Sequence, residues 1–235
     1  LDLHLLLTAT FVAVPLALRD AGLTSSQHWQ VYLPALTLSM AAMIPFIILA
    51  ERRRQLKTVF LGAILTLVLV EFGLAALPDT VLEITVLLLA FFTAFNLLEA
   101  ILPSLITKLA PPDAKGTAMG VYSSSQFLGA FAGGALGGWL NGQFGPHGVF
   151  AFATLGALAW LLVAWTMREP PYLSGYLLNV GILDEVEAQL LTLRLVEVPG
   201  VAEAAVAADE GVAYLKVDRR TLDEAMLRQF AADTP

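Results

Sequence analysis

Long apolar segments separated by short polar stretches fill the first two thirds of the chain. Each is close to the ~20 residues that a helix needs to cross the hydrocarbon core of a bilayer. The pattern therefore predicts an all-α membrane bundle of six transmembrane helices. Their expected bounds are 1–18, 29–50, 58–77, 80–102 (continuing to 109 past Pro103), 116–140 and 149–167.

After Pro170-Pro171 the pattern changes to short strands and helices. Asp184-x-x-Glu187 and Thr221-x-x-Glu224 match the capping box that begins a helix. The expected order βαββα is typical of a small α+β, ferredoxin-like domain whose fourth strand is absent or very short. We expect strands at 175–182, 201–208 and 212–217, and helices at 184–198 and 221–230. The expected domains are a transmembrane bundle at 1–167, a linker at 168–174 and a cytoplasmic domain at 175–235.

Composition supports this division of the chain. The chain is 57% hydrophobic and 14% charged, with a mean hydropathy of +0.74, whereas soluble proteins carry about 25% charged residues. Residues 1–167 have a net charge of −1 and residues 168–235 have −6, which together give −7. The sequence contains no cysteine, which excludes disulfides and thiolate metal sites. No basic face suits nucleic acid, and we expect neither a cofactor nor a metal.

Basic residues lie mostly in the loops on one side of the predicted membrane. The positive-inside rule assigns that side to the cytoplasm. Both chain ends and the soluble domain are then cytoplasmic, in a multi-pass protein of the cell (inner) membrane that contacts membrane lipids. This side carries Arg52, Arg53, Arg54, Lys57, Lys108, Lys115 and Arg168, and the opposite side carries Arg19.

Segment 116–140 carries no charged side chain and is dense in glycine. Glycines four residues apart form a strip of small surface along a helix, and such strips let membrane helices approach closely. Another face of this segment, at 122–126, can line a polar cavity. The expected helix-packing residues are Gly129, Gly133, Gly134, Gly137 and Gly138.

Uncharged polar side chains inside the predicted helices are candidates for binding a transported solute. Gln126, near the middle of the fifth segment, is the first candidate for a hydrogen bond, and Asn96 is the second. Each can equally be a satisfied polar contact between helices. The full set of substrate-cavity candidates is Gln126, Asn96, Thr10, Ser39 and Tyr122.

Ionisable side chains within membrane helices are costly and mark functional sites. Glu99 shares a helix face with Asn96, and we favour an ion pair with Arg52 or Arg54 over a role as proton carrier. Four other groups are expected to be solvated or at the headgroups, because they fall near the ends of segments. These are Glu71 and Glu83 at the outer turn, and Asp2 and His4 at the inner side.

The basic run after the second segment has two interpretations. In the first, it fixes the topology and contacts anionic lipid. In the second, Glu51 pairs with Arg52–Arg54 across helix ends in one conformation and releases them in another, as a latch. The proton-coupling or ion-pair candidates are thus Glu99, Glu51, Arg52 and Arg54.

Residues 50–57, AERRRQLK, resemble the degenerate second copy of the loop signature of the major facilitator superfamily. Glu51 and Arg52 match its acidic–basic pair, while Ile47 stands in place of its leading glycine. Residues 115–140 are similar to the eleventh helix of YajR-type drug-efflux-like members. The tail, with VPGV at 198–201 and VAYLKVD at 212–218, resembles the small cytoplasmic YAM domain of those transporters.

This resemblance implies that residues 1–167 are helices seven to twelve of a twelve-helix transporter, half of a major facilitator fold. It implies a partner, the N-terminal six-helix half, and proton-coupled export. The chain begins at Leu1 inside an apolar run that is no signal peptide, so we expect a fragment whose N-terminal part is missing. The tail also resembles heavy-metal-associated domains, but Gly181–Asp184 contains no cysteine to bind a soft metal.

The sequence therefore predicts a secondary active transporter for proton-coupled efflux of a small molecule, present as its C-terminal half with a cytoplasmic regulatory domain. The alternative is a non-transporting membrane sensor whose tail is a ligand- or ion-sensing output domain. An enzyme is not expected, because no segment pairs a nucleophile with a base. The three histidines, His4, His28 and His147, are scattered.

Overall fold

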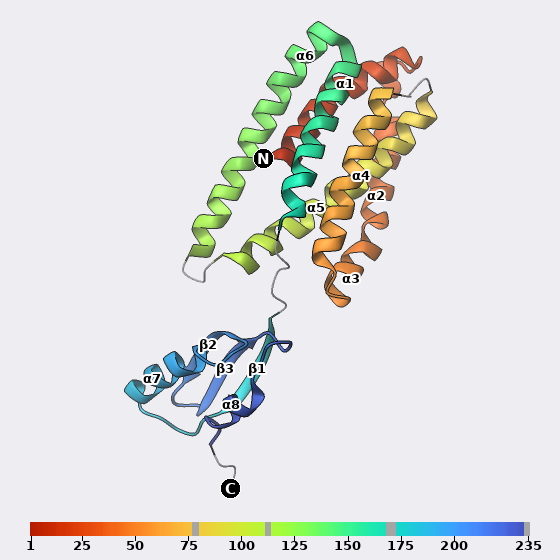
Figure 1. The fold of residues 1–235 in the computed structure, drawn as a ribbon. Coiled ribbons are helices and arrows are strands. Elements are labelled where there is room, and N and C mark those ends of the chain that lie inside the picture. Colours follow the sequence, from red (N-terminus) through yellow and green to blue (C-terminus); the bar gives the residue numbers. More distant parts are fainter. Residues whose placement is uncertain (77–79, 111–113, 168–172, 233–235) are drawn as a thin grey trace. The chain divides into compact units, whose positions relative to one another are not determined.

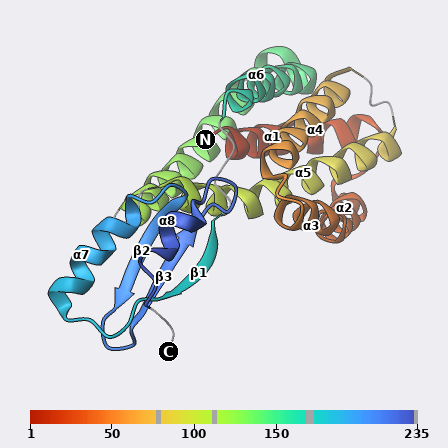
Figure 2. The same ribbon diagram turned by 60° about the horizontal axis from the view of Figure 1, so that its bottom comes forward.

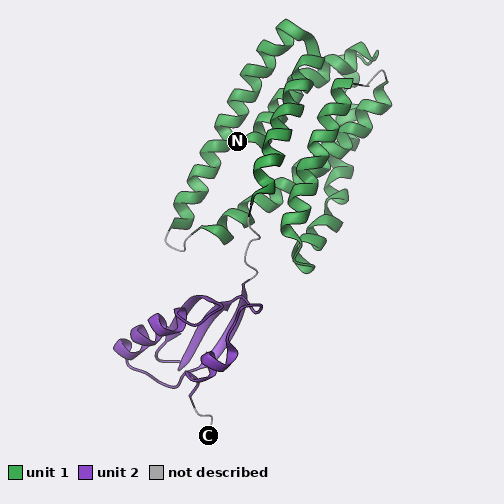
Figure 3. Ribbon diagram, in the orientation of Figure 1, with its two compact units in different colours: residues 1–170 green, residues 171–235 purple. Residues whose placement is uncertain are grey.

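The computed structural model describes residues 1–76, 80–110, 114–167 and 173–232. It divides into two compact units, residues 1–170 and 171–235 (Figure 3). The expected turn at Pro78-Asp79 and most of the expected linker at 168–174 lie outside the described residues. Each unit is considered by itself below.

The described part of the first unit is helical, as the long apolar segments predict. Five stretches are long and apolar enough to cross a membrane: α1, residues 25–52, α4, α5 and α6. The six expected segments appear as five because the last two lie within one helix. The helices are α1 (Asp2–Asp20), the short η1 (Ser25–Gln27), α2 (Trp29–Ala42), α3 (Ile44–Arg52), α4 (Leu56–Ala76), α5 (Val81–Leu109) and α6 (Lys115–Trp165).

Helix α6 contains both the fifth and the sixth expected segment. Its helical geometry is interrupted at Gly145, where φ is 69° and ψ is −173°. A positive φ favours glycine, which has no Cβ to clash. The ribbon reverses direction at this point (Figure 1), so α6 has a first arm, 115–144, and a second arm, 146–165. The turn expected at 141–148 is thus reduced to one non-helical residue.

Prolines shape the second apolar segment. It is divided into α2 and α3 at Met43, and Pro45 lies in the first turn of α3. Proline has no N–H to donate to the preceding turn, so it suits the start of a helix and interrupts one that would otherwise continue. Pro34, by contrast, lies inside α2 without ending it.

The bundle is held together by apolar side chains that face its interior. Helix α1 packs against α6, and both ribbon views show the two side by side (Figures 1 and 2). Helix α4 packs against α5 and α6, and α2 packs against α5. The largest fully buried side chains here are Phe91, Phe150, Leu6, Leu18, Leu56, Ile64, Leu67, Leu74, Ile84, Leu88 and Leu98.

The second unit has the expected element order, strand–helix–strand–strand–helix. Its three strands form an antiparallel sheet in the order β1-β3-β2. Alternate residues of β3 (Ala213, Leu215 and Val217) are buried in its core. The elements are β1 (Ser174–Asn179), α7 (Glu185–Val196), β2 (Val201–Ala207), β3 (Val212–Val217) and α8 (Glu224–Arg228).

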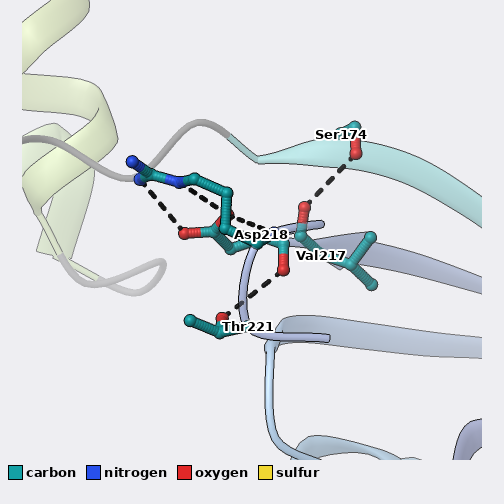
Figure 4. A network of polar contacts seen from close by, with 5 residues as sticks. Ser174, Val217, Asp218 and Thr221 are labelled. Atoms are coloured by element: carbon teal, nitrogen blue, oxygen red, sulfur yellow. Dashed lines mark hydrogen bonds and ion pairs between the residues drawn. The ribbon is translucent and has the colours of Figure 1, made fainter. Parts of the chain in front are cut away.

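The two helix starts of this unit differ in how well the sequence predicts them. Asp184 accepts a hydrogen bond from the Glu187 backbone N–H at 2.7 Å, as the capping box predicts. The expected cap at Thr221 is wrong, because Asp223 accepts from the Met226 N–H at 2.9 Å and begins α8. The Thr221 hydroxyl donates instead to the carbonyl of Asp218, and Ser174 donates to the carbonyl of Val217 (Figure 4).

Candidate functional site

Glu99 on α5 lies in a polar cluster that three helices form inside the first unit. Gln126 on α6 donates from Nε2 to Glu99 Oε1 at 3.2 Å and to the hydroxyl of Tyr122 at 2.9 Å. Nδ1 of His4, on α1, lies 3.8 Å from the same oxygen of Glu99. At this distance a protonated imidazole forms an ion pair with a carboxylate.

Helix periodicity explains why these side chains meet. Tyr122 and Gln126 are four residues apart, so they share a face of α6. The His4 ring packs edge-on against Phe95, with ring centroids 5.9 Å apart, and Phe95 lies one turn before Glu99 on α5. The side chains of His4 and Glu99 remain 21% and 33% exposed, so neither group is sealed inside the described unit.

A small cavity of about 130 Å³ adjoins the cluster. A water molecule occupies about 30 Å³ in the liquid, and sites for drug-sized ligands usually measure about 300–1,000 Å³. The cavity therefore has room for a few waters or one polar group of a solute, but not for a whole drug-sized molecule. It is lined by Leu1, Asp2, Leu3, His4, Leu102, Tyr122, Gln126 and Trp160.

The cluster combines groups that bind protons with groups that only form hydrogen bonds. A carboxyl group and an imidazole can each gain or lose a proton, whereas the amide of Gln126 cannot. The Gln126 N–H donates to a carboxyl oxygen of Glu99. The arrangement can hold a proton beside a polar group of a solute. The sequence favoured Arg52 or Arg54 as partners of Glu99, whereas the contacts described for it are to an amide, an imidazole and the hydroxyl of Tyr122.

Two other substrate-cavity candidates contact each other away from this cluster. Nδ2 of Asn96 donates to Ser39 Oγ at 3.0 Å. Ser39 is fully buried and donates to the carbonyl of Leu36 at 2.8 Å. Ser39 therefore both accepts and donates, and this pair is a satisfied contact between α5 and α2.

The remaining candidate, Thr10, is also fully buried, on α1. Its Oγ1 lies 2.6 Å from Oε1 of Glu71 on α4. The expectation that Glu71 is solvated is wrong, because its side chain has no exposed surface. Residues 64, 67 and 74 share its helix face and are buried with it.

The acidic and basic candidates at the end of the second segment lie on the surface. Glu51 pairs with Lys108 on α5 at 3.8 Å, where the side chain of Glu51 is exposed and that of Lys108 is partly exposed. Arg52 ends α3, and Arg54 has a φ of 54°, in the left-handed region that terminates helices. The ion pair described here joins α3 to α5, whereas the latch interpretation placed it between Glu51 and the arginines.

The glycine candidates divide into two groups. Gly129, Gly133 and Gly137 are buried against α1, where an added Cβ would meet the backbone of Leu1, Leu5 and Ala9 respectively. Gly134 and Gly138 have no atom within 4 Å of such a Cβ. The close approach of α1 to α6 therefore depends on a strip of three glycines.

Sequence reasoning missed Thr8 as a contact between helices. Its Oγ1 lies 2.9 Å from the carbonyl oxygens of His4 and of Ala130 on α6. It also missed His4 as a neighbour of Glu99, because the residue spacing within one helix does not show which residues of another helix pack against it. In the described ranges, no three His, Asp or Glu side chains gather into a metal site.

Comparison with known proteins decides the family. A sequence model of the Major Facilitator Superfamily matches residues 3–195. The chain belongs to the Major Facilitator Superfamily. This confirms the resemblance, and the chain is also 44% identical over 228 residues to the inner membrane transport protein YajR of Escherichia coli (strain K12). That match covers 97% of this chain and 50% of YajR.

Other members of the superfamily match smaller shares. An uncharacterized transporter, BU466, of Buchnera aphidicola subsp. Acyrthosiphon pisum is 30% identical over 131 residues, which cover 56% of this chain and 34% of the relative. The multidrug resistance protein MdtH of Aeromonas hydrophila is 31% identical over 121 residues, 52% of this chain and 30% of MdtH. The chain spans about half the length of YajR. Its family is one of membrane transporters rather than enzymes.

Proposed function

We propose that this chain is the C-terminal half of a secondary active transporter that exports a small molecule in exchange for protons, with Glu99 as a proton-binding residue. The observation that carries the proposal is the convergence of Glu99, His4, Gln126 and Tyr122 beside a cavity. Ionisable groups inside membrane helices mark proton and substrate pathways. The name of the relative MdtH, a multidrug resistance protein, supports export.

Proton binding and solute binding would be linked through the charge of Glu99. An ionised Glu99 accepts from Gln126 and attracts a protonated His4 or a cationic group of a solute. A proton on Glu99 removes that attraction, so the proton and the cationic group compete. Such competition is the physical basis of exchange, provided that the site is open to one side of the membrane at a time.

The proposed architecture is six membrane crossings, with the two arms of α6 as the fifth and sixth. A second six-helix half of the same protein would supply the other wall of the cavity, which explains why the cavity beside the cluster is small. The lysine and arginine residues in and beside the segments that join α3 to α4 and α5 to α6 support a cytoplasmic position for both chain ends. The name of YajR supports the inner membrane.

The second unit is proposed to be a ferredoxin-like domain that regulates transport. Its strand order β1-β3-β2 with all strands antiparallel matches three strands of that fold, without the fourth strand beside β1. The lack of cysteine makes delivery of a soft metal a poor explanation for it.

Transport in liposomes tests the proposal. The full-length protein, reconstituted with a pH-sensitive dye inside the vesicles, should move protons when compounds of a broad panel are added. Glu99→Gln should reduce this movement at least about tenfold, which corresponds to ~1.4 kcal/mol. Glu83→Gln is the matched control on the same helix, because Glu83 is exposed and caps α5 at Thr80. Proton movement that survives Glu99→Gln would remove Glu99 from the mechanism, and no movement with any compound would contradict proton exchange.

Removal of residues 172–235 separates the transporter from the sensor alternative. A transporter should keep measurable flux without its regulatory domain, with an altered rate. A non-transporting sensor would show no flux in either form.

A further inference from the structure

Glu71 and Thr10 form a second carboxyl site, apart from the Glu99 cluster. Both side chains are fully buried. Thr10 Oγ1 lies 2.6 Å from Glu71 Oε1 and 2.7 Å from the carbonyl oxygen of Leu6. The other carboxyl oxygen, Glu71 Oε2, is buried and has no hydrogen-bond partner in the part of the chain that the structure describes.

The number of protons distinguishes the two states of this carboxyl group. The Thr10 hydroxyl has one proton and two short contacts to oxygen, and an ionised carboxylate can only accept. If Glu71 is ionised, one of the two contacts therefore brings oxygen atoms together with no proton between them. If Glu71 carries a proton on Oε1, it donates to Thr10, and Thr10 donates to Leu6. Only the protonated acid gives each contact a proton.

The burial of Glu71 also favours its protonated form. An ionised carboxylate away from water needs several donors or a cation to be stable. Among the described residues, the hydroxyl of Thr10 would be the only donor to such a carboxylate, and Oε2 would have none. A neutral carboxylic acid loses much less hydration on burial, so one hydrogen bond suffices.

No neighbouring ionisable group among the described residues forms an ion pair that would neutralise an ionised Glu71. His147 on α6 contacts α4 at a different position, since its Nδ1 lies 2.9 Å from the carbonyl of Ala75, one turn after Glu71. Within the described residues, Thr10 is the one hydrogen-bond partner of Glu71 and no ion pair includes it. The ionisable residues of the surrounding helices are Asp2, His4, Arg19 and Asp20 on α1, Glu51 and Arg52 on α3, Glu83, Glu99 and Lys108 on α5, and Lys115, Tyr122 and His147 on α6.

We propose that Glu71 is a proton-binding residue, held as a neutral carboxylic acid between α1 and α4 and separate from the Glu99 cluster. The proton completes the chain of hydrogen bonds from Glu71 through Thr10 to Leu6. Loss of this proton would leave a buried negative charge with one donor. The contact between α1 and α4 would then have to open to water. The inference concerns a protonation state and does not depend on the proposed transport.

Infrared spectroscopy of the full-length protein in detergent at neutral pH tests this proposal. The carbonyl stretch of a neutral carboxylic acid is separate from the bands of carboxylates and amides. We expect such a band in the unmodified protein, its loss in Glu71→Gln, and its persistence in Glu99→Gln and in Glu83→Gln. If Glu71→Gln removes a carboxylate band instead and leaves the acid band unchanged, Glu71 is ionised and the proposal is wrong.

A second variant keeps the test decisive if Glu71→Gln does not fold. Thr10→Val has nearly the same shape and removes the hydroxyl that accepts from the acid. The acid band should then move to higher frequency, because the carboxyl O–H has lost its acceptor. Thr93→Val is the matched control, since the Thr93 hydroxyl donates to the carbonyl of Leu89 in its own helix. A band that is unmoved by Thr10→Val, or moved equally by Thr93→Val, would contradict the assignment.

Discussion

Glu99 and Glu71 are two carboxyl groups in one helical bundle, and they have opposite surroundings. Glu99 is 33% exposed, belongs to a polar cluster beside a small cavity, and has an amide and an imidazole among its neighbours. Glu71 has no exposed surface and one hydroxyl as its partner. Both lie in strongly apolar helices, so the hydropathy of the segment does not distinguish them. Exposure and the number of hydrogen-bond donors are thus the two properties that distinguish these carboxyl groups, for which we propose proton exchange at Glu99 and a retained proton at Glu71.

Both carboxyl groups contact the same helix. Helix α1 supplies His4 to Glu99 and Thr10 to Glu71, and it is itself held against α6 by the strip Gly129, Gly133 and Gly137. One labelling measurement and three substitutions test this difference, through accessibility, helix packing, a buried hydrogen bond and an exposed ion pair.

The largest expected difference is in chemical labelling of the two acids. A water-soluble carbodiimide with an amine nucleophile should modify Glu99 at least about tenfold faster than Glu71, because a sealed group reacts only when the structure opens locally. Mass spectrometry of peptides from the full-length protein measures both rates in one sample. Exposed Glu83 is the internal reference for full access. Equal labelling rates at Glu99 and Glu71 would contradict the difference in accessibility between the two carboxyl groups.

Displacement of α1 should disturb both acids together. In Gly133→Ala the new methyl group would meet the Leu5 backbone, with its Cα 2.8 Å away, so we expect a loss of about 3 kcal/mol in unfolding free energy, the upper part of the range for overpacking. Gly134→Ala is the matched control, since nothing lies within 4 Å of its Cβ, and should change stability by less than about 0.5 kcal/mol. Thermal unfolding in detergent measures both. Equal effects would show that α1 does not approach α6 at this face.

Removal of the Thr10 hydroxyl should affect Glu71 and leave Glu99 unchanged. Thr10→Val leaves Glu71 without a hydrogen-bond partner, and an unsatisfied buried polar group costs about 2 kcal/mol. The rate of carbodiimide labelling at Glu99 should stay unchanged. Thr93→Val, where the hydroxyl bonds only within its own helix, should cost less than about 1 kcal/mol. A Thr10→Val protein as stable as the unmodified one would mean that the pair contributes little.

The exposed ion pair should give the smallest effect. Glu51 and Lys108 are 3.8 Å apart, with side chains 59% and 34% exposed, and solvent and salt screen such pairs. Glu51→Gln should therefore change stability by about 0.5 kcal/mol or less, and the difference should vanish in high salt. Unfolding measured at two salt concentrations checks this. A loss above about 1.5 kcal/mol at high salt would instead favour the latch interpretation.

The helical elements could be predicted from sequence because the length of an apolar run is a local property. The same holds for the start of α7, where Asp184 and Glu187 cap each other over one turn. The start of α8 was misjudged because Asp223, two residues after Thr221, competes for the same role. The reversal between the fifth and sixth expected segments was predicted as a turn at 141–148, whereas the structure makes it at one non-helical residue, Gly145.

The surroundings of the acids were harder to predict. Glu71 was expected near water because few residues separate it from the outer turn. The direction of its side chain decided otherwise, since Ile64, Leu67 and Leu74 on the same face are fully buried. The spacing of these apolar residues relative to Glu71 already indicated in the sequence that its side chain would be buried. The neighbours of Glu99 could not be predicted from the sequence, because His4 and Gln126 come from helices distant in sequence and only tertiary packing brings them together.

His4 and Thr10 are six residues apart on α1, which corresponds to ~9 Å along the axis and ~240° around it. Helix α1 contacts Glu99 and Glu71 at different heights and on different sides. If α1 moves as a rigid body, it cannot slide or rotate at one acid without also moving at the other. Any shift of α1 caused by a charge change at one carboxyl group would therefore also change the contact that α1 makes with the other.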